Sequence, residues 1–173
     1  MANHVKFQLN NCSVSGNRVE FDVFITNDGT TDMVLNSSQF GVNIDPLCLG
    51  SGFTMQSVTN GYVGNTEVSP PLPSWTAQAN RSSITSLRFS TPPSLSITKD
   101  TGLKFPVGKT YKLGRFYIDS ATGFVSGLMT NLKLQDVVSA GKTVCAVNAW
   151  VGASTILTGI QPPNVSTENI CSI

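Results

Sequence analysis

Hydrophobic and polar residues alternate along residues 19–26 and again along residues 40–44 of this chain. The apolar positions are Val19, Phe21, Val23, Ile25, Phe40, Val42 and Ile44. A period of two is typical of half-buried antiparallel strands. Between the stretches, Asn27-Asp28-Gly29 supplies residues that tolerate positive φ in a turn. We therefore predict an antiparallel hairpin from Val19 to Ile44.

Similar short stretches recur along the chain, separated by Gly, Pro, Asn and Ser. Helical periodicity is nearly absent, because the best candidate, Leu132–Ala140, is short and rich in β-branched residues. Without helices, βαβ crossovers cannot form. We predict an all-β fold, an antiparallel jelly-roll sandwich of about nine strands. The further strand candidates are 5–9, 53–59, 83–90, 111–119, 132–134, 143–151 and 154–158.

Two segments interrupt this rhythm. The prolines of Ser69–Trp75 lack the N–H donors that a central strand needs, so we expect a rigid exposed excursion there. Residues 161–173 look like a C-terminal tail or linker, tied down through Cys171. The predicted organisation is one sandwich over residues 1–160, followed by that tail.

The composition favours a secreted β-protein. Charged residues make up 12% of the chain, against about 25% in an average soluble domain. The net charge of +1 and the scattered Lys and Arg residues give no reason to expect nucleic acid or an anionic membrane surface. No apolar run is long enough for membrane insertion. We expect an extracellular or cell-surface location, although Met1 leads directly into a strand without a signal peptide in this numbering.

Four cysteines, Cys12, Cys48, Cys145 and Cys171, lack the spacing of a metal site. An even number in a β-domain with few charges predicts up to two disulfides and an oxidising compartment. Three connectivities are open. The alternative is a set of buried thiols, because cysteine is a good small core residue.

Several motifs resemble the cohesin-like and carbohydrate-binding-module-like sandwiches of secreted Bacteroidota surface proteins. The run FDVFITNDGTTDMVLNSSQFGVN over residues 21–43 resembles their opening strands, and LGRF over 113–116 their GRFRL-type strand. NAWVG over 148–152 is similar to their AYVGG ending, and Pro92-Pro93 to their proline-rich approach to a loop. The resemblance implies a nine-stranded jelly roll without catalytic residues. The chain departs from the family in its cysteines.

Catalysis is the minority hypothesis. The chain has one histidine, His4, at the start of the first strand, and a nucleophile needs a general base beside it. We expect His4 to be an exposed strand residue. No glycine-rich phosphate loop or HExxH motif is present. We predict that the protein is not an enzyme.

Calcium is the metal that the sequence suggests most readily, since oxygen ligands cluster at Asn27, Asp28 and Asp32. The spacing is not that of an EF-hand. A turn without metal explains the same residues and is the preferred interpretation.

Carbohydrate binding would use exposed aromatic rings beside amide and charged side chains. Trp75 follows the proline-rich excursion and is the best candidate, whereas Trp150 lies in an apolar strand and is assigned to the core. The alternative role for Trp75 is a hydrophobic clasp over the sandwich. The predicted site comprises Trp75, Tyr62, Gln78, Asn80 and Arg81.

Protein binding is the leading hypothesis. Phe24 is the one large apolar residue on the polar face of its strand, so it could join an interaction patch. Sandwich edges with few Lys residues also invite strand addition. The sequence thus predicts a non-catalytic extracellular module for adhesion, scaffolding or self-assembly through protein partners or copies of itself, with polysaccharide binding as the alternative.

Overall fold

The computed structural model describes residues 3–45, 48, 58–64, 75–79, 86–91, 95–125 and 132–169. The regular elements among them are all β-strands, which confirms the all-β class and exceeds the nine strands expected. The strands are Val5–Ser15 (β1), Arg18–Asn27 (β2), Met33–Asn43 (β3), Val58–Gly64 (β4), Thr76–Ala79 (β5), Ser86–Ser90 (β6), Leu103–Phe105 (β7), Thr110–Ser120 (β8), Lys133–Leu134 (β9), Ala146–Val151 (β10), Leu157–Ile160 (β11) and Val165–Asn169 (β12).

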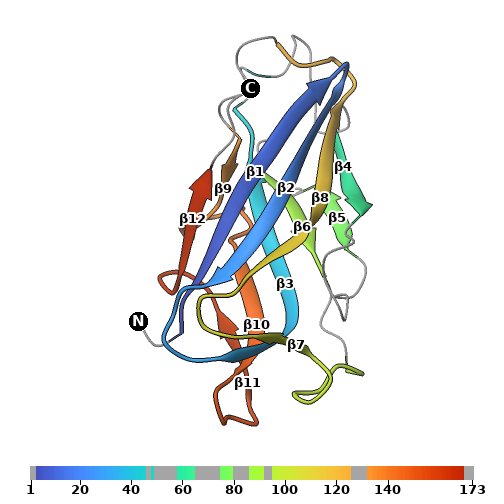
Figure 1. Ribbon diagram of the computed structural model, residues 1–173. Helices are drawn as coiled ribbons and strands as arrows, with labels where there is room; N and C mark the ends of the chain where they lie inside the picture. The colour runs from blue at the N-terminus through green and yellow to red at the C-terminus, as the bar shows by residue number, and fades with distance from the viewer. Residues whose placement is uncertain are drawn as a thin grey trace.

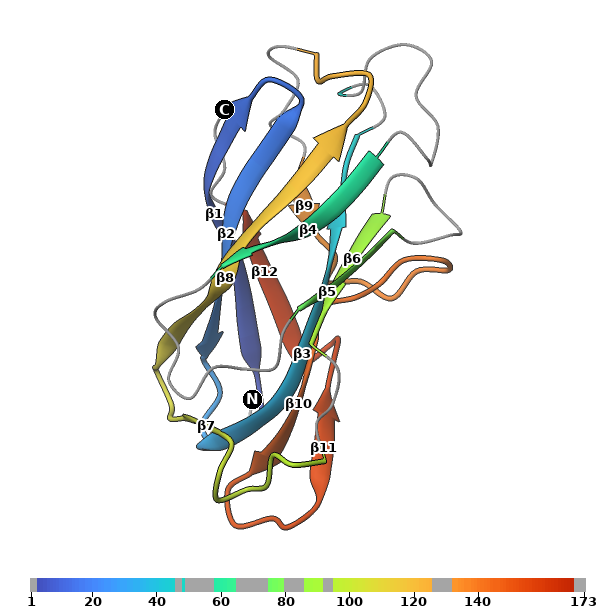
Figure 2. The ribbon, with the colours of Figure 1, turned by 90° about the vertical axis from the view of Figure 1, so that its right-hand side faces the viewer.

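The strands form two sheets packed face to face as a β-sandwich (Figures 1 and 2). The five-stranded sheet has the order β12-β1-β2-β8-β4. The seven-stranded sheet has the order β11-β10-β3-β6-β5, with β7 and β9 also paired to β3. β1 and β12 are parallel, with Val5 opposite Val165, and the other described pairs are antiparallel.

Alternate residues of both sheets fill the space between them, as a period of two requires. Four phenylalanines form the centre of this core. The rings of Phe40 and Phe89 stack with centroids 4.8 Å apart, and Phe116 meets Phe40 edge-on at 4.8 Å. Phe21 contacts Phe89 and Phe116 from the five-stranded sheet. Burying each such side chain stabilises the fold by about 1.5–3 kcal/mol.

The predicted Val19–Ile44 hairpin is wrong. β2 pairs with β1 and β8 in the five-stranded sheet, whereas β3 pairs with β6 and β10 in the seven-stranded sheet. The turn at Asn27 therefore links the two layers. Alternation identifies the face of a strand that is buried, but it does not identify the neighbouring strand.

The C-terminal prediction also needs correction. Residues 161–173 do not form only a tail, because β12 adds to the sheet beside β1. β12 has one buried apolar residue, Val165, so its sequence does not alternate clearly between apolar and polar positions. The strand expected at residues 154–158 lies at Leu157–Ile160 instead. The candidate helix at residues 132–140 contains the short strand β9.

Candidate functional site

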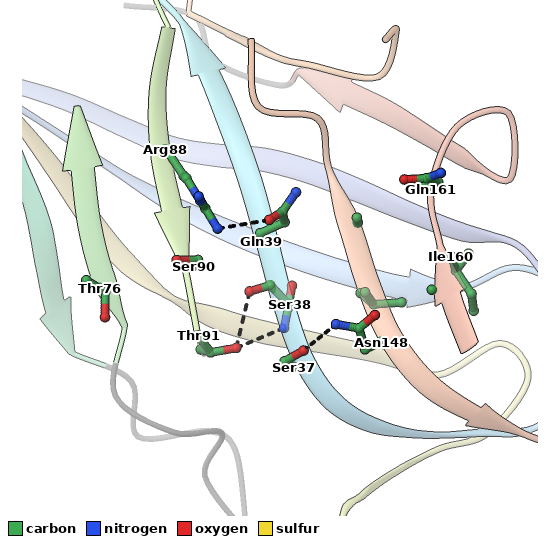
Figure 3. A pocket seen from close by; sticks show the side chains of 13 residues that line it. Ser37, Ser38, Gln39, Thr76, Arg88, Ser90, Thr91, Asn148, Ile160 and Gln161 are labelled. Carbon is green, nitrogen blue, oxygen red and sulfur yellow. Dashed lines mark hydrogen bonds between the residues drawn. The ribbon is translucent and has the colours of Figure 1, made fainter. Parts of the chain in front are cut away.

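A polar pocket of about 430 Å³ lies on the outer face of the seven-stranded sheet (Figure 3). Strand alternation creates it. Phe40, Phe89 and Val147 point into the core, so the residues beside them in sequence point outward. The pocket crosses β5, β6, β3, β10 and β11 and is lined by Ser37, Ser38, Gln39, Thr76, Arg88, Ser90, Thr91, Ala146, Val147, Asn148, Gly159, Ile160 and Gln161.

The lining consists mainly of hydroxyl and amide groups. The Asn148 amide Nδ2 donates to Oγ of Ser37 at 2.8 Å, which joins β10 to β3 across the floor. Thr91 Oγ1 accepts from the backbone N–H of Ser38 at 2.8 Å. These bonds fix the side chains in place, while the remaining lone pairs and hydroxyl protons can serve a ligand.

A crossing segment bounds one end of the pocket. Residues 135–144 pass over β3 at Gly41, where an added Cβ would lie 1.8 Å from the carbonyl oxygen of Thr143. The Gln39 amide Nε2 donates to the carbonyl of Val144 at 3.2 Å. Gly41 is therefore required for the close approach of this segment to β3, next to Gln39 of the pocket.

An apolar groove of about 580 Å³ adjoins the pocket at its other end. Trp150 and Leu157 of the groove are two residues from Asn148 and Gly159 of the pocket, on the same face of β10 and β11. This places the neighbours about 7 Å apart along each strand. We call this surface the Trp150 groove; its lining is Asn36, Leu95, Ile97, Thr98, Lys99, Asp100, Trp150, Thr155 and Leu157.

The assignment of Trp150 to the core is wrong. Its neighbours Ala149 and Val151 flank it in an apolar strand, but Ala149 is the residue that is fully buried. The indole is half-buried on the outer face, opposite Val34 and Leu157. The apolar character of β10 reflects a groove on one side as well as the core on the other.

Trp75 belongs instead to the edge of the core. Its ring lies 5.5 Å from that of Phe40 and 5.1 Å, edge-on, from that of Phe116. Tyr62 also packs on Phe116, at 5.3 Å, and burial raises the pKa of its hydroxyl. These contacts favour the clasp role that was the alternative for Trp75.

The rest of the predicted carbohydrate site is only partly described. Gln78 lies on β5, opposite Arg88 of β6. Asn80 and Arg81 lie outside the described residues.

Phe24 is half-buried on the outer face of the five-stranded sheet. It stands between Gln8 of β1 and Lys112 of β8 in the strand register. These long side chains flank the ring on both sides. Phe24 thus differs from the prominent apolar residues of the molecule, of which Leu95 is 103% exposed and Ile156 72% exposed.

The outer face of the five-stranded sheet carries a cross-strand charge ladder. Arg18 bonds Asp119 through two contacts of 2.7 and 2.8 Å. Arg115 Nε bonds Glu20 at 2.8 Å. We use the name charge ladder for Arg18, Glu20, Asp22, Lys112, Arg115 and Asp119.

Asp22 is the buried centre of the charge ladder. Its side chain is 5% exposed and contacts Lys112 and Arg115, each at 3.1 Å. Burial alone raises the pKa of Asp22, but hydrogen bonds from Asn11, Lys112 and Arg115 outweigh it and leave the pKa below its usual range. The ladder satisfies its own charges and has a structural role.

The predicted calcium residues are engaged in closing their loop. Asp28 Oδ1 bonds His4 Nδ1 at 2.6 Å, and Asp32 Oδ1 accepts the backbone N–H of Val107 at 2.9 Å. The amide of Asn27 bonds backbone groups on both sides of the turn. Within the described residues no group of three or more His, Cys, Asp or Glu side chains gathers. These bonds account for the turn, and calcium there stays a prediction.

His4 is not the exposed residue expected from the sequence. It is 6% exposed and is held by the contact with Asp28. That contact fastens the start of β1 to the turn after β2. A carboxylate partner and the absence of a nucleophile beside it in the described structure give His4 a packing role.

Two of the four cysteines carry buried reduced thiols, so the disulfides predicted through Cys48 and Cys145 are wrong. Burial raises the pKa of Cys145 to about 12, which keeps it protonated and unreactive. Cys12 is half-buried against the core. Cys12 is disulfide-bonded, as the sequence predicted. Cys171 lies outside the described residues, so its pairing with Cys12 stays a prediction.

Sequence reasoning missed the pocket residues, although a signal was present. The run Asn36-Ser37-Ser38-Gln39 interrupts the apolar pattern of β3 where a core strand would continue it. Arg88 and Asn148 each stand between buried residues of their strands. The pairing of strands far apart in the sequence is what gathers these residues.

Among the described residues no helix is long and apolar enough to span a membrane. The chain matches no family model and no curated protein. A comparison with solved structures finds AvmM, which catalyzes macrocyclization in alchivemycin A biosynthesis, at 11% identity. The match covers 96% of this chain and 82% of that one, with a TM-score of 0.32. A TM-score this low carries no functional argument.

Proposed function

We propose that the protein is a non-catalytic extracellular module that binds carbohydrate across the outer face of its seven-stranded sheet. The observation that carries this proposal is the polar pocket continuing into the Trp150 groove. Sugars present hydroxyl groups that donate and accept, together with apolar ring faces. The pocket offers amides and hydroxyls for the first, and Trp150 offers an aromatic face for the second.

The size of the surface supports the same proposal. A volume of about 430 Å³ for the pocket and about 580 Å³ for the groove falls in the range of small-ligand sites. The described lining of the pocket holds no carboxylate pair for glycoside hydrolysis. Binding without chemistry is thus what this lining supports.

The test is retention on immobilised polysaccharides. Trp150→Ala and Asn148→Ala should each lower retention about tenfold or more, because each removes a side chain that the proposal places against the ligand. Phe24→Ala is the matched control, an aromatic residue on the outer face of the other sheet, and should bind as the wild type does. Absence of retention on every neutral and acidic polysaccharide would overturn the proposal.

A protein partner or a second copy is the second candidate. β11 is an edge strand whose residues 157–159 are exposed, and the described residues place no element on its outer side. By contrast, β12 has a described neighbour on its far side: Oδ1 of Asn169 accepts a hydrogen bond from the backbone N–H of Leu134 in β9 at 3.0 Å. Ile156 and Leu95 add exposed apolar surface near β11.

Light scattering over a concentration series tests this second candidate. Self-association through β11 should appear as a rising mass that Ile156→Lys abolishes, since a charge opposes strand addition. A constant monomer mass at high concentration would rule out assembly by the chain alone.

An extracellular location predicts a disulfide between Cys12 and Cys171. The parallel register sets Leu9 opposite Asn169, and the two cysteines follow three and two residues later in the sequence. Peptide mapping without reductant should show alkylation of Cys48 and Cys145 after unfolding only, and none of the other two. Four alkylated thiols would contradict secretion.

A further inference from the structure

Arg88 is the charged residue in the lining of the polar pocket. It is half-buried, and its side chain extends over the pocket toward Gln39 (Figure 3). The guanidinium Nη2 lies 3.4 Å from Oε1 of Gln39, a long contact for a hydrogen bond. Nε is buried and bonds no group in the described part of the chain.

The other described arginines have a different environment. Arg18 bonds Asp119, and Arg115 bonds both Glu20 and Asp22. Arg88 makes no ion pair with any described residue, and no described Asp or Glu lines the pocket. Buried arginine charge is normally paired. A guanidinium in this setting lacks the anion that the other two arginines have.

We infer that the polar pocket binds a sugar that carries a carboxylate, such as a uronic acid residue, with Arg88 receiving the carboxylate. The guanidinium presents a planar fork of donors that matches the two coplanar oxygens of a carboxylate. Ser90 and Asn148 lie within the same pocket and supply partners for the ring hydroxyls. This inference rests on the proposed function and names its ligand class.

The positive charge of Arg88 and the otherwise uncharged described lining determine whether an acidic or a neutral sugar binds more tightly. A uronate brings one negative charge to one guanidinium, and the pocket lining adds no acidic group to repel it. A neutral sugar of the same shape would leave the Arg88 guanidinium without a charged partner. The acidic sugar should therefore bind more tightly than its neutral counterpart.

The experiment compares a uronic acid oligosaccharide with the same oligosaccharide after reduction of its carboxyl groups. Calorimetry with the wild type should give about tenfold or more tighter binding of the acidic form, the range for a hydrogen-bonded charged group. Arg88→Gln should bind both forms equally, and Arg88→Lys should keep part of the preference because it retains the charge without the fork.

Lys133→Gln is the matched control, because it removes an exposed positive charge from β9 of the same sheet, outside the described linings of the polar pocket and the Trp150 groove. It should leave the preference unchanged, whereas a general electrostatic attraction would weaken it. Equal binding of both oligosaccharides by the wild type would overturn the carboxylate inference and leave carbohydrate binding intact. Tighter binding of a sulfated oligosaccharide would also overturn it. Absence of binding to every oligosaccharide would overturn the proposed function itself.

Discussion

The outer faces of the two sheets differ in whether their charged side chains are paired. On the five-stranded sheet, acidic and basic side chains alternate across strands and bond one another in the charge ladder. On the seven-stranded sheet the described lining of the polar pocket is uncharged except for Arg88, which no described acid pairs. A face that satisfies its own charges has little to offer a ligand, whereas the other face presents unused donors beside an aromatic groove.

Among the tests of this contrast, Asp22→Ala should have the largest effect on the free energy of unfolding. It leaves Lys112 and Arg115 around a buried position with no carboxylate, so the free energy of unfolding should fall by about 3 kcal/mol. Denaturant unfolding measures the loss. Glu168→Ala is the control on the same face, because its side chain is 46% exposed; it should change stability far less than Asp22→Ala does. Equal effects of the two changes would contradict the structural role of the ladder.

Gly41→Ala tests the other face. The new Cβ would meet the carbonyl of Thr143, so the segment over residues 135–144 must shift, and we expect a loss of about 2 kcal/mol. The same shift should weaken ligand retention, because the carbonyl of Val144 in this segment holds the amide of Gln39, which lines the polar pocket. Gly108→Ala in an open turn is not a suitable control, since its φ of +76° adds backbone strain. Gly64→Ala meets no atom within 4 Å and is suitable.

Acid should lower the free energy of unfolding through the protonation of Asp22 on the five-stranded sheet. The pKa of Asp22 is lowered in the folded protein, so its contribution to stability is present above its unfolded pKa of about 3.9 and is lost as the pH falls through the lower folded value. Unfolding free energy measured from pH 5 to pH 2 should fall less steeply in Asp22→Asn than in the wild type. Parallel curves would show that Asp22 does not carry this dependence.

The sequence predicts the buried face of each strand well and the strand neighbours poorly. Alternation at Phe21 and Phe40 correctly places both rings in the core, yet these strands belong to different sheets. The same limit hides the polar pocket. Ser37, Arg88 and Asn148 are each recognisable as outward residues, but only the pairing of β3 with β6 and β10 brings them together. Trp75 packs at the edge of the core and Trp150 lines an outer groove, the reverse of the expected placement, because hydrophobicity alone does not distinguish the core from a groove.

Arg88→Gln should have the smallest effect on stability, and its result decides whether Arg88 has a structural role. Because no described carboxylate depends on Arg88, its loss should change the free energy of unfolding by less than about 0.5 kcal/mol. Arg115→Gln is the matched change on the other face, where it removes the partner of Glu20 and Asp22 and should cost about 2 kcal/mol. Denaturant unfolding of both variants makes the comparison. If Arg88→Gln destabilises the protein as much as Arg115→Gln does, then the Arg88 guanidinium stabilises the fold. The two faces would then not differ in how they use their arginines, and the argument for a ligand at Arg88 would fail.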